Sequence, residues 1–261
     1  MTRRSRDNEP RRIAYGGKPL YGARLGILML EAAFPRIPGD MGNAETWPFP
    51  VLYKVIAGAT PARVVRRRAD GLFEAFAAGA EELVRLGADG ITSNCGFLSL
   101  FQAEIARRAG VPTALSSLMQ VPWIESLLPP GKRCGILTVS AESLSAEHLV
   151  SAGCDPATPV AGTDGGRELS RVLLADEREL DLGLAEADIL AAGEELVARH
   201  AALGAIVLEC TNMAPFARAL NEATGLPVYD IVSFVTWFHA GLRPRDFGWP
   251  AREPKEWRER R

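Results

Sequence analysis

The chain lacks a long apolar segment. Its longest apolar runs, such as GILML and AIVLEC, fall far short of the about 20 residues that a membrane-spanning helix needs. The N-terminal segment MTRRSRDNEPRR is basic, but no apolar stretch follows it, so it does not have the form of a secretory signal. We therefore expect a soluble protein with no membrane partner and a cytoplasmic location.

A strong charge of either sign is also missing. The 261 residues include 30 Lys and Arg against 32 Asp and Glu, which gives a net charge of −2. Proteins that bind nucleic acids usually carry a clear basic patch or an excess of basic residues. We therefore expect no nucleic-acid partner and favour a small-molecule substrate. The sequence leaves open whether the subunits pair as a homo-oligomer.

The residue patterns of metal and cofactor sites are absent as well. The four cysteines have no C-x-x-C spacing and no histidine nearby, and the three histidines are scattered. The glycine-rich stretch GTDGGRELS lacks the Lys-Ser/Thr ending of a phosphate loop, and no G-x-G-x-x-G occurs. We expect no metal and no organic cofactor, and free thiols rather than disulfides in a reducing cytoplasm.

The patterns that are present alternate between strand and helix. Leu25 to Leu30 form a short apolar run, and from Asp70 to Leu86 apolar residues recur at the spacing of an amphipathic helix. The order of patterns in the first half is β-α-β-α-β, and it begins again at Cys134 after a proline-rich connector. This order predicts an α/β protein with parallel sheets flanked by helices.

The second half of the chain resembles the first. LGILML resembles CGILTV, and LGADGITSNC resembles LGAIVLEC. A glycine and a proline follow Cys95 by 15 and 17 positions, and the same two residue types follow Cys210 by the same intervals. Ordered self-similarity of this kind predicts two pseudo-symmetric lobes with the two cysteines at equivalent positions.

We divide the chain into four parts on this basis. Residues 1–20 are expected to be a mobile N-terminal tail, residues 21–120 the first lobe and residues 121–230 the second lobe. Residues 231–261 are expected to form a C-terminal helix and tail. Packing of this last part on the first lobe is left open.

Cys95 and Cys210 each stand where a strand gives way to a helix. Ligands of open α/β sheets bind at the carboxyl ends of the strands, so two facing lobes would bring these thiols to opposite walls of one cleft. A helix N-terminus lowers the pKa of a thiol from ~8.5 toward neutrality, so we expect a thiolate base. Cys134 is interpreted as a buried strand residue, and Cys154 as part of a surface turn.

Other candidate residues are weaker. Glu209 precedes Cys210 on the expected strand and should point away from it, so we interpret it as a lobe-packing or supporting group. His200 shares a helix face with apolar residues and is interpreted as structural. A Cys-His hydrolase would need a histidine that reaches one thiol, and it would leave the second thiol unexplained.

The segment from Ala32 to Pro50 is a long loop rich in proline and glycine. Arg36, Asp40 and Asn43 within it could contact a substrate. The same composition also suits a rigid surface excursion. The sequence favours neither interpretation.

The motifs SNCG and ECTN, each built around one of the two cysteines, resemble those of the cofactor-independent aspartate/glutamate racemase superfamily. This superfamily also includes hydantoin racemases, maleate cis-trans isomerases and arylmalonate decarboxylases. The resemblance covers nearly the whole chain, from Leu25 to Trp237. It implies a pseudo-twofold pair of flavodoxin-like lobes with the active site between them.

The resemblance also implies roles for individual residues. Cys95 and Cys210 fall on the two catalytic thiol positions of the family. Gly96 departs from the threonine that amino-acid racemases usually have there. The residues at implied substrate-binding positions are Asn94, Gly96, Thr138, Ser140, Thr211 and Asn212.

The chemistry of racemisation explains why two thiols would be needed. Inverting a carbon beside a carboxylate requires a base on one face and an acid on the other, and a thiolate and a thiol can fill both roles. We therefore predict a cofactor-independent racemase acting on a small carboxylate such as an amino acid or a derivative. The alternatives are a maleate-type cis-trans isomerase, an arylmalonate-type decarboxylase and a non-catalytic ligand-binding relative.

Overall fold

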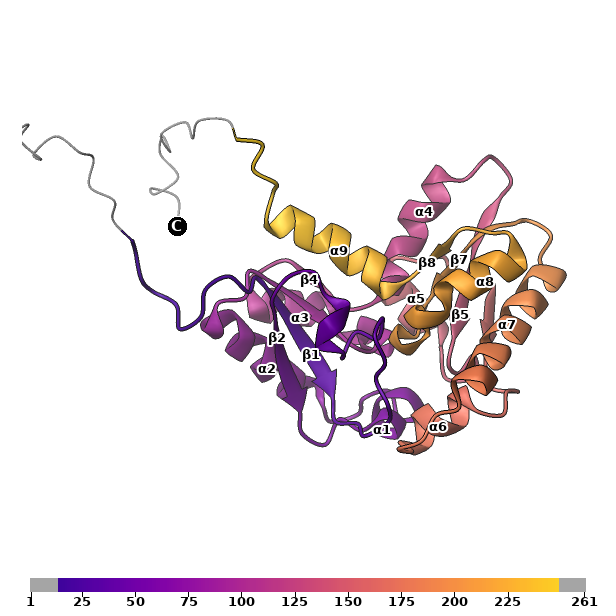
Figure 1. The fold of residues 1–261 in the computed structure, drawn as a ribbon, viewed down its shortest axis with the longest axis horizontal. Helices are drawn as coiled ribbons and strands as arrows, with labels where there is room; N and C mark the ends of the chain where they lie inside the picture. Colours follow the sequence, from indigo (N-terminus) through magenta and orange to yellow (C-terminus); the bar gives the residue numbers. More distant parts are fainter. Residues whose placement is uncertain (1–13, 249–261) are drawn as a thin grey trace, which may run out of the picture.

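The protein is built on two parallel four-stranded sheets (Figure 1). The structure is a computed structural model that describes residues 14–248. The strands are β1 (Leu25–Leu30), β2 (Val51–Ile56), β3 (Gly90–Ser93), β4 (Thr113–Ala114), β5 (Arg133–Thr138), β6 (Val160–Gly162), β7 (Leu203–Leu208) and β8 (Val228–Tyr229). The first sheet has the order β2-β1-β3-β4 and the second the order β6-β5-β7-β8.

Helices connect the strands and cover the sheets. The α-helices are α1 (Pro61–Arg66), α2 (Phe73–Leu86), α3 (Gln102–Ala109), α4 (Val121–Leu127), α5 (Ala146–Ser151), α6 (Leu169–Ala175), α7 (Leu182–Arg199), α8 (Ala217–Thr224) and α9 (Ile231–Leu242). Residues 14–248 also include four short 3-10 helices: η2 (Ala44–Thr46), η3 (Gly96–Phe101), η4 (Ser117–Gln120) and η5 (Thr211–Phe216).

The two sheets repeat the same topology. In each, the first strand pairs on one side with the second and on the other with the third, and every pairing is parallel. Parallel strands need crossover connections, which is why helices separate most of them. The predicted fold class, two pseudo-symmetric lobes with parallel sheets flanked by helices, is confirmed.

Several elements differ from the sequence interpretation. The helix expected after Cys95 begins as the 3-10 helix η3 and becomes α-helical only at α3. Strand β2 was not predicted, because it is a half-buried edge strand that contains Lys54 and has no clear apolar run. The proline-rich connector holds helix α4, since Pro122 stands in the first turn, where proline is compatible with a helix.

The C-terminal helix α9 packs on the first lobe. Strand β1 is buried on both faces, and successive side chains point to opposite sides of its sheet. Leu28 and Leu30 enter the main core, whereas Leu25 and Ile27 enter a second core together with Phe234 of α9. Helix α9 therefore covers part of a face of the first sheet (Figure 1). The predicted tail residues 1–13 and 249–261 lie outside the described part.

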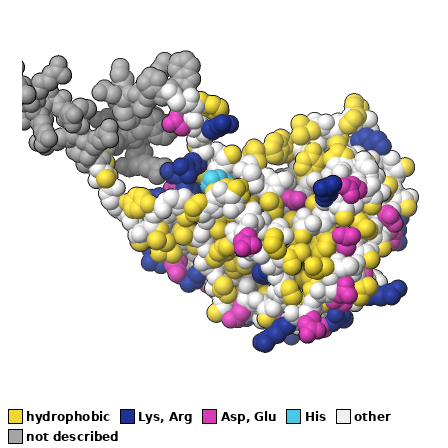
Figure 2. Space-filling model, in the orientation of Figure 1, with side chains coloured by type: hydrophobic (Ala, Val, Ile, Leu, Met, Phe, Trp, Pro, Cys, Tyr) yellow, Lys and Arg dark blue, Asp and Glu magenta, His cyan; other side chains and the backbone are white. Residues whose placement is uncertain are grey.

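Acidic and basic side chains are interspersed over the face of the molecule shown in Figure 2. This mixture agrees with the small net charge of the chain. Among residues 14–248, no helix combines the length and the apolar character that crossing a membrane requires.

Candidate active site

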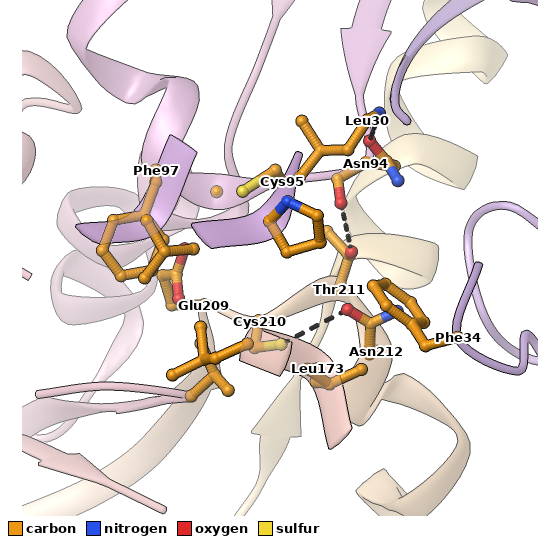
Figure 3. Close-up of a pocket in the computed structure, with 15 residues that line it drawn as sticks. Leu30, Phe34, Asn94, Cys95, Phe97, Leu173, Glu209, Cys210, Thr211 and Asn212 are labelled. Atoms are coloured by element: carbon orange, nitrogen blue, oxygen red, sulfur yellow. Dashed lines mark hydrogen bonds between the residues drawn. The ribbon is translucent and has the colours of Figure 1, made fainter. Parts of the chain in front are cut away.

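A pocket that contains both cysteines lies between the carboxyl ends of the two sheets (Figure 3). The space between its walls is about 390 Å³, including the mouth. Most of its lining is apolar, with Phe34 and Phe97 as the aromatic members. The polar or ionisable lining residues are Asn94, Cys95, Glu209, Cys210, Thr211 and Asn212.

Cys95 lies on the wall formed by the first lobe. It follows strand β3 and is the residue that precedes the 3-10 helix η3. The backbone N–H of Phe97 is directed at its sulfur, and only 8% of the residue is exposed. The thiol therefore sits at the start of a helical turn, as the sequence predicts, but in an almost dry environment.

Cys210 has the equivalent place in the second lobe. It follows strand β7 and precedes the 3-10 helix η5. Its sulfur donates to the side-chain oxygen of Asn212 at 3.6 Å, and the backbone N–H of Asn212 is directed at the sulfur. Only 7% of the residue is exposed. Figure 3 shows Cys95 and Cys210 on different sides of the same pocket.

The expected lowering of the cysteine pKa values is wrong for this structure. Burial raises the pKa of both thiols, and the nearby carboxylate of Glu209 raises them further. The backbone N–H groups of Phe97 and Asn212 act in the opposite direction but are outweighed. Each thiol is followed by a short 3-10 turn, whereas the sequence pattern suggested a regular helix. Both thiols are therefore protonated at neutral pH in this arrangement.

Glu209 is a pocket residue that the sequence interpretation missed. Strand β7 ends at Leu208, so the alternation of side chains no longer applies one residue later, and Glu209 lines the pocket. The residue is fully buried, and burial raises its pKa to about 7, although a hydrogen bond from Thr138 opposes this shift. The signal available in the sequence was positional, since Glu209 precedes Cys210 as Asn94 precedes Cys95.

Asn94 and Thr211 join the two lobes at the pocket. The side-chain oxygen of Asn94 accepts the backbone N–H of Leu30 at 2.8 Å. The hydroxyl of Thr211 donates to the backbone carbonyl of Asn94 at 2.6 Å. The Thr211 hydroxyl is therefore committed to holding the lobes together. Among the described residues, the amide nitrogen of the Asn94 side chain has no hydrogen-bond partner and can serve a ligand.

Gly96 lines the pocket at a point where there is no room for a side chain. A β-carbon at this position would collide with the side-chain oxygen Oε1 of Glu209 and lie 2.7 Å from the backbone oxygen of the same residue. The glycine that departs from the family pattern therefore makes room for the buried carboxylate. The glycine at position 96 and the place of Glu209 in the pocket are therefore explained by the same close contact.

Thr138 and Ser140 are placed outside the pocket. The hydroxyl of Thr138 is fully buried and donates to Oε2 of Glu209 at 2.5 Å, so it supports a pocket residue from behind. Ser140 bonds to Ser143 and lines a separate surface depression that also includes Arg66. The structure therefore brings together six of the eight predicted site residues.

The loop from Ala32 to Pro50 reaches the site directly through Phe34, which lines the pocket, and indirectly through Asn212. Asp40 is 2% exposed, forms an ion pair with Arg36 at 3.0 Å and accepts a hydrogen bond from the side chain of Asn212. Asn43 caps the short helix η2 and donates to the backbone of Arg36. None of the three loop residues lines the pocket, so the loop orients Asn212, which in turn accepts from Cys210.

Two further cysteines are structural. Cys134 is fully buried in β5, as expected. Cys154 is also buried, at 5% exposure, and donates to the carbonyl of Leu118 at 3.2 Å, so its assignment to a surface turn was wrong. Within residues 14–248, no group of three or more His, Cys, Asp or Glu side chains is arranged to hold a metal ion.

Curated relatives were found by sequence. A dimethylsulfoniopropionate lyase from Durusdinium sp. clade D is 28% identical over 233 residues, covering 84% of this chain and 75% of that protein. Dimethylsulfoniopropionate lyase 6 from Emiliania huxleyi is 28% identical over 220 residues, covering 80% of this chain and 57% of that protein. This chain thus spans little more than half the length of the second relative. No family model matches the chain.

Solved structures with the same fold are more distant in sequence. The allantoin racemase from Klebsiella pneumoniae has a TM-score of 0.59 and 19% identity, covering 88% of this chain and 95% of that chain. A variant of arylmalonate decarboxylase has a TM-score of 0.58 and 14% identity, covering 88% and 96%. A putative Asp/Glu racemase from Yersinia pestis has a TM-score of 0.51 and 12% identity, covering 84% and 98%.

The predicted activity is corrected by the sequence relatives. We predicted an amino-acid racemase or isomerase, but the curated relatives are lyases. Both reactions can begin with removal of a proton beside a carboxylate, and the motifs around Cys95 and Cys210 do not reveal what happens to the resulting carbanion. The fold expectation is confirmed by the solved structures. The chain has the two-lobed fold seen in the solved structures of allantoin racemase, arylmalonate decarboxylase and a putative Asp/Glu racemase.

Proposed function

We propose that this protein is a lyase that eliminates dimethyl sulfide from dimethylsulfoniopropionate or from a closely similar sulfonium carboxylate. The observation that carries the proposal is the similarity to lyases of this name over 84% of the chain. A continuous match of that extent includes both Cys95 and Cys210. The pocket adds chemical support, because it places two thiols around one small space.

The reaction needs a base but no redox partner. In dimethylsulfoniopropionate the carbon beside the carboxylate carries the acidic hydrogen, and the next carbon carries the sulfonium group. A base removes the hydrogen, its electron pair forms the new C=C bond, and the C–S bond breaks with its electrons remaining on sulfur. The products are acrylate, neutral dimethyl sulfide and one proton. A cysteine thiolate is a suitable base for the first step.

Cys95 and Cys210 are the groups that can supply this base. They lie on different sides of the pocket, so a carbon bound between them presents one face to each sulfur. An elimination uses one base, in contrast to a racemisation, which uses an acid and a base. The two thiols should therefore contribute unequally, and the substitution with the greater loss of kcat identifies the base.

The carboxylate of the substrate requires hydrogen-bond donors, since its charge increases as the proton leaves. The side-chain amide of Asn94 is available for this purpose. The backbone N–H groups of Gly96 and Thr211 also lack an acceptor among the described residues. Fixed donors in a pocket shielded from water stabilise a developing negative charge strongly. These three donors form the proposed carboxylate site.

The proposal is tested by following the purified protein and dimethylsulfoniopropionate in heavy water by proton NMR. We expect acrylate and dimethyl sulfide in equal amounts, and no formation of either with a variant that carries both Cys95→Ser and Cys210→Ser. Deuterium in recovered substrate without release of dimethyl sulfide would show proton abstraction without elimination. That result, or an absence of any reaction, would contradict the proposal.

A further inference from the structure

Three buried side-chain atoms among residues 14–248 have no hydrogen-bond partner: Nη2 of Arg36, Nε2 of His148 and Oε1 of Glu209. The histidine needs no charged partner, because burial lowers its pKa to about 4 and the imidazole is neutral at physiological pH. Arg36 already shares an ion pair with Asp40. Glu209 remains as a buried carboxyl group without a cation, and it lines the pocket.

The surroundings of Glu209 contain few donors. Its oxygen Oε2 accepts from Thr138, and its oxygen Oε1 lies against Gly96, which has no side chain. Other residues that line the pocket, such as Phe97 and Val139, are apolar. One oxygen of this pocket-lining carboxyl group therefore receives no hydrogen bond from the described residues. Buried polar atoms are normally satisfied, so an unsatisfied one calls for an explanation.

A particular class of cation matches this arrangement. An ammonium or guanidinium group would bring several N–H donors, and the apolar walls could not satisfy all of them. A sulfonium or quaternary ammonium group has no N–H or O–H donor and presents its charge through methyl groups. Such groups pack well against apolar and aromatic side chains, and Phe97 lines the same pocket. Their attraction to a carboxylate is strong in a site shielded from water.

We infer that Glu209 is the counter-ion for the onium group of the substrate, so that the pocket selects methylated onium carboxylates over neutral molecules of the same shape. The inference rests on the proposed function for the identity of the sulfonium substrate. It assigns a specificity-determining role to a residue that neither removes the proton nor binds the carboxylate.

The same ion pair would couple binding to the thiols. Burial raises the pKa of both Cys95 and Cys210, and the negative charge of Glu209 raises it further. A bound onium group compensates that charge, so the thiols lose a proton more readily when substrate is present. Burial still raises the thiol pKa values, but the base would form more readily in the complex than in the free protein.

The experiment measures charge preference by calorimetric titration of the full chain with two probes. One is 3-(trimethylammonio)propionate, whose trimethylamine is a poorer leaving group than dimethyl sulfide. The other is 4,4-dimethylpentanoate, which has the same shape without the positive charge. We expect the wild type to bind the onium probe more tightly by about tenfold or more, as for other close charge pairs. Glu209→Gln should reduce that ratio by about tenfold.

A matched control is Glu168→Gln. Glu168 is another carboxylate at 6% exposure, but it lies outside the pocket and pairs with Arg171. This control should retain the wild-type preference. If Glu209→Gln retains it as well, or if the wild type binds neither probe, the inference is overturned.

A second variant covers the case in which Glu209→Gln fails to fold. Thr138→Val keeps the carboxyl group but removes the hydrogen bond that favours its ionised form. Tight onium binding should then begin at a higher pH than in the wild type. An unchanged pH dependence would contradict the inference.

The outcome also separates this inference from the proposed function. A wild type that prefers the onium probe but does not release dimethyl sulfide from dimethylsulfoniopropionate supports the counter-ion and refutes the lyase. A wild type that releases dimethyl sulfide while Glu209→Gln keeps the full charge preference supports the lyase and refutes the counter-ion.

Discussion

The chain segments around Cys95 and Cys210, called the two cysteine corners below, have the same backbone conformation but different charges. In each corner a strand of the lobe ends, a cysteine follows, and a six-residue 3-10 helix leads into an α-helix of eight residues. Asn94 precedes one cysteine and Glu209 precedes the other. The first accepts a hydrogen bond from the end of β1 and the second from the end of β5, which are equivalent strands.

This difference bears on the reaction. A racemisation treats the two faces of one carbon in similar ways, whereas an elimination expels a group from one side of the substrate. A neutral amide in one corner and a buried carboxyl group in the other make the pocket electrically unsymmetrical. Such a site suits a substrate with a carboxylate at one end and a cation at the other. Repetition of the backbone therefore does not imply repetition of the chemistry.

The largest expected effect comes from breaking the thiol pair. Replacing Cys95 or Cys210 with serine keeps the shape but removes a group that can act as a base near neutral pH. We expect one variant to lose about 10³-fold in kcat, within the range of general base catalysis, and the other to lose clearly less. Steady-state kinetics with dimethylsulfoniopropionate measures both. Equal losses would favour a mechanism that uses both thiols alike.

The next effect is a change in stability with pH, and it concerns only the corner that contains Glu209. The pKa of Glu209 is raised from 4.5 to about 7, so the native state holds a proton that the unfolded state has released over this interval. The stabilisation from this group is full below pH 4.5 and is lost as the pH rises through about 7, a change of about 3 kcal/mol.

Urea unfolding of the wild type and of Glu209→Gln at about pH 5 and about pH 8 measures this change. The free energy of unfolding of the variant should improve relative to the wild type by about 2 to 3 kcal/mol between these two pH values. Asn94→Ala, which alters the neutral corner, should show no such pH dependence. A constant difference between wild type and Glu209→Gln would mean that the carboxyl group titrates normally.

A smaller effect follows from the fit between Gly96 and Glu209. Gly96→Ala places a methyl group against the carboxyl oxygen and the backbone of Glu209, so we expect a loss of about 2 kcal/mol in unfolding free energy. Gly165→Ala is the control, because a β-carbon there meets no atom within 4 Å. Chemical denaturation measures the unfolding free energy of both variants. Similar small losses in both would show that the structure around Gly96 can shift to accept the methyl group.

Making the corners alike should move the pH dependence only slightly, although it should also lower kcat/KM because it removes the Asn94 amide that we propose as a donor to the substrate carboxylate. Asn94→Asp keeps an oxygen that can accept from Leu30 but adds a second carboxylate near the thiols. Like charge disfavours thiolate formation, so the pH at which elimination reaches its plateau should rise by about one unit. A pH-rate profile tests this shift. A plateau at the wild-type pH would show that the added charge does not change the pKa of the thiol base.

The sequence was sufficient for the features that repeat. The intervals after Cys95 and Cys210 predicted equivalent corners, and each α-helix that follows does end at a glycine with left-handed backbone geometry. Asn94, Gly96, Thr211 and Asn212 were placed at the pocket from their motifs, and all line it.

The features that the sequence did not reveal depend on tertiary packing. Glu209 enters the pocket because its strand stops one residue earlier than the pattern suggests. The thiol pKa values depend on burial, which a motif does not report. The role of Asp40 arises from a contact with Asn212, 172 residues away in the chain. None of these follows from local periodicity.

The most direct test of the account is the release of dimethyl sulfide into the headspace above a solution of the purified protein and dimethylsulfoniopropionate, measured by gas chromatography. The account predicts steady release by the wild type that is proportional to protein concentration and is abolished when Cys95 and Cys210 are both replaced by serine in a folded variant. No release by the wild type, or equal release by the double variant, would contradict it.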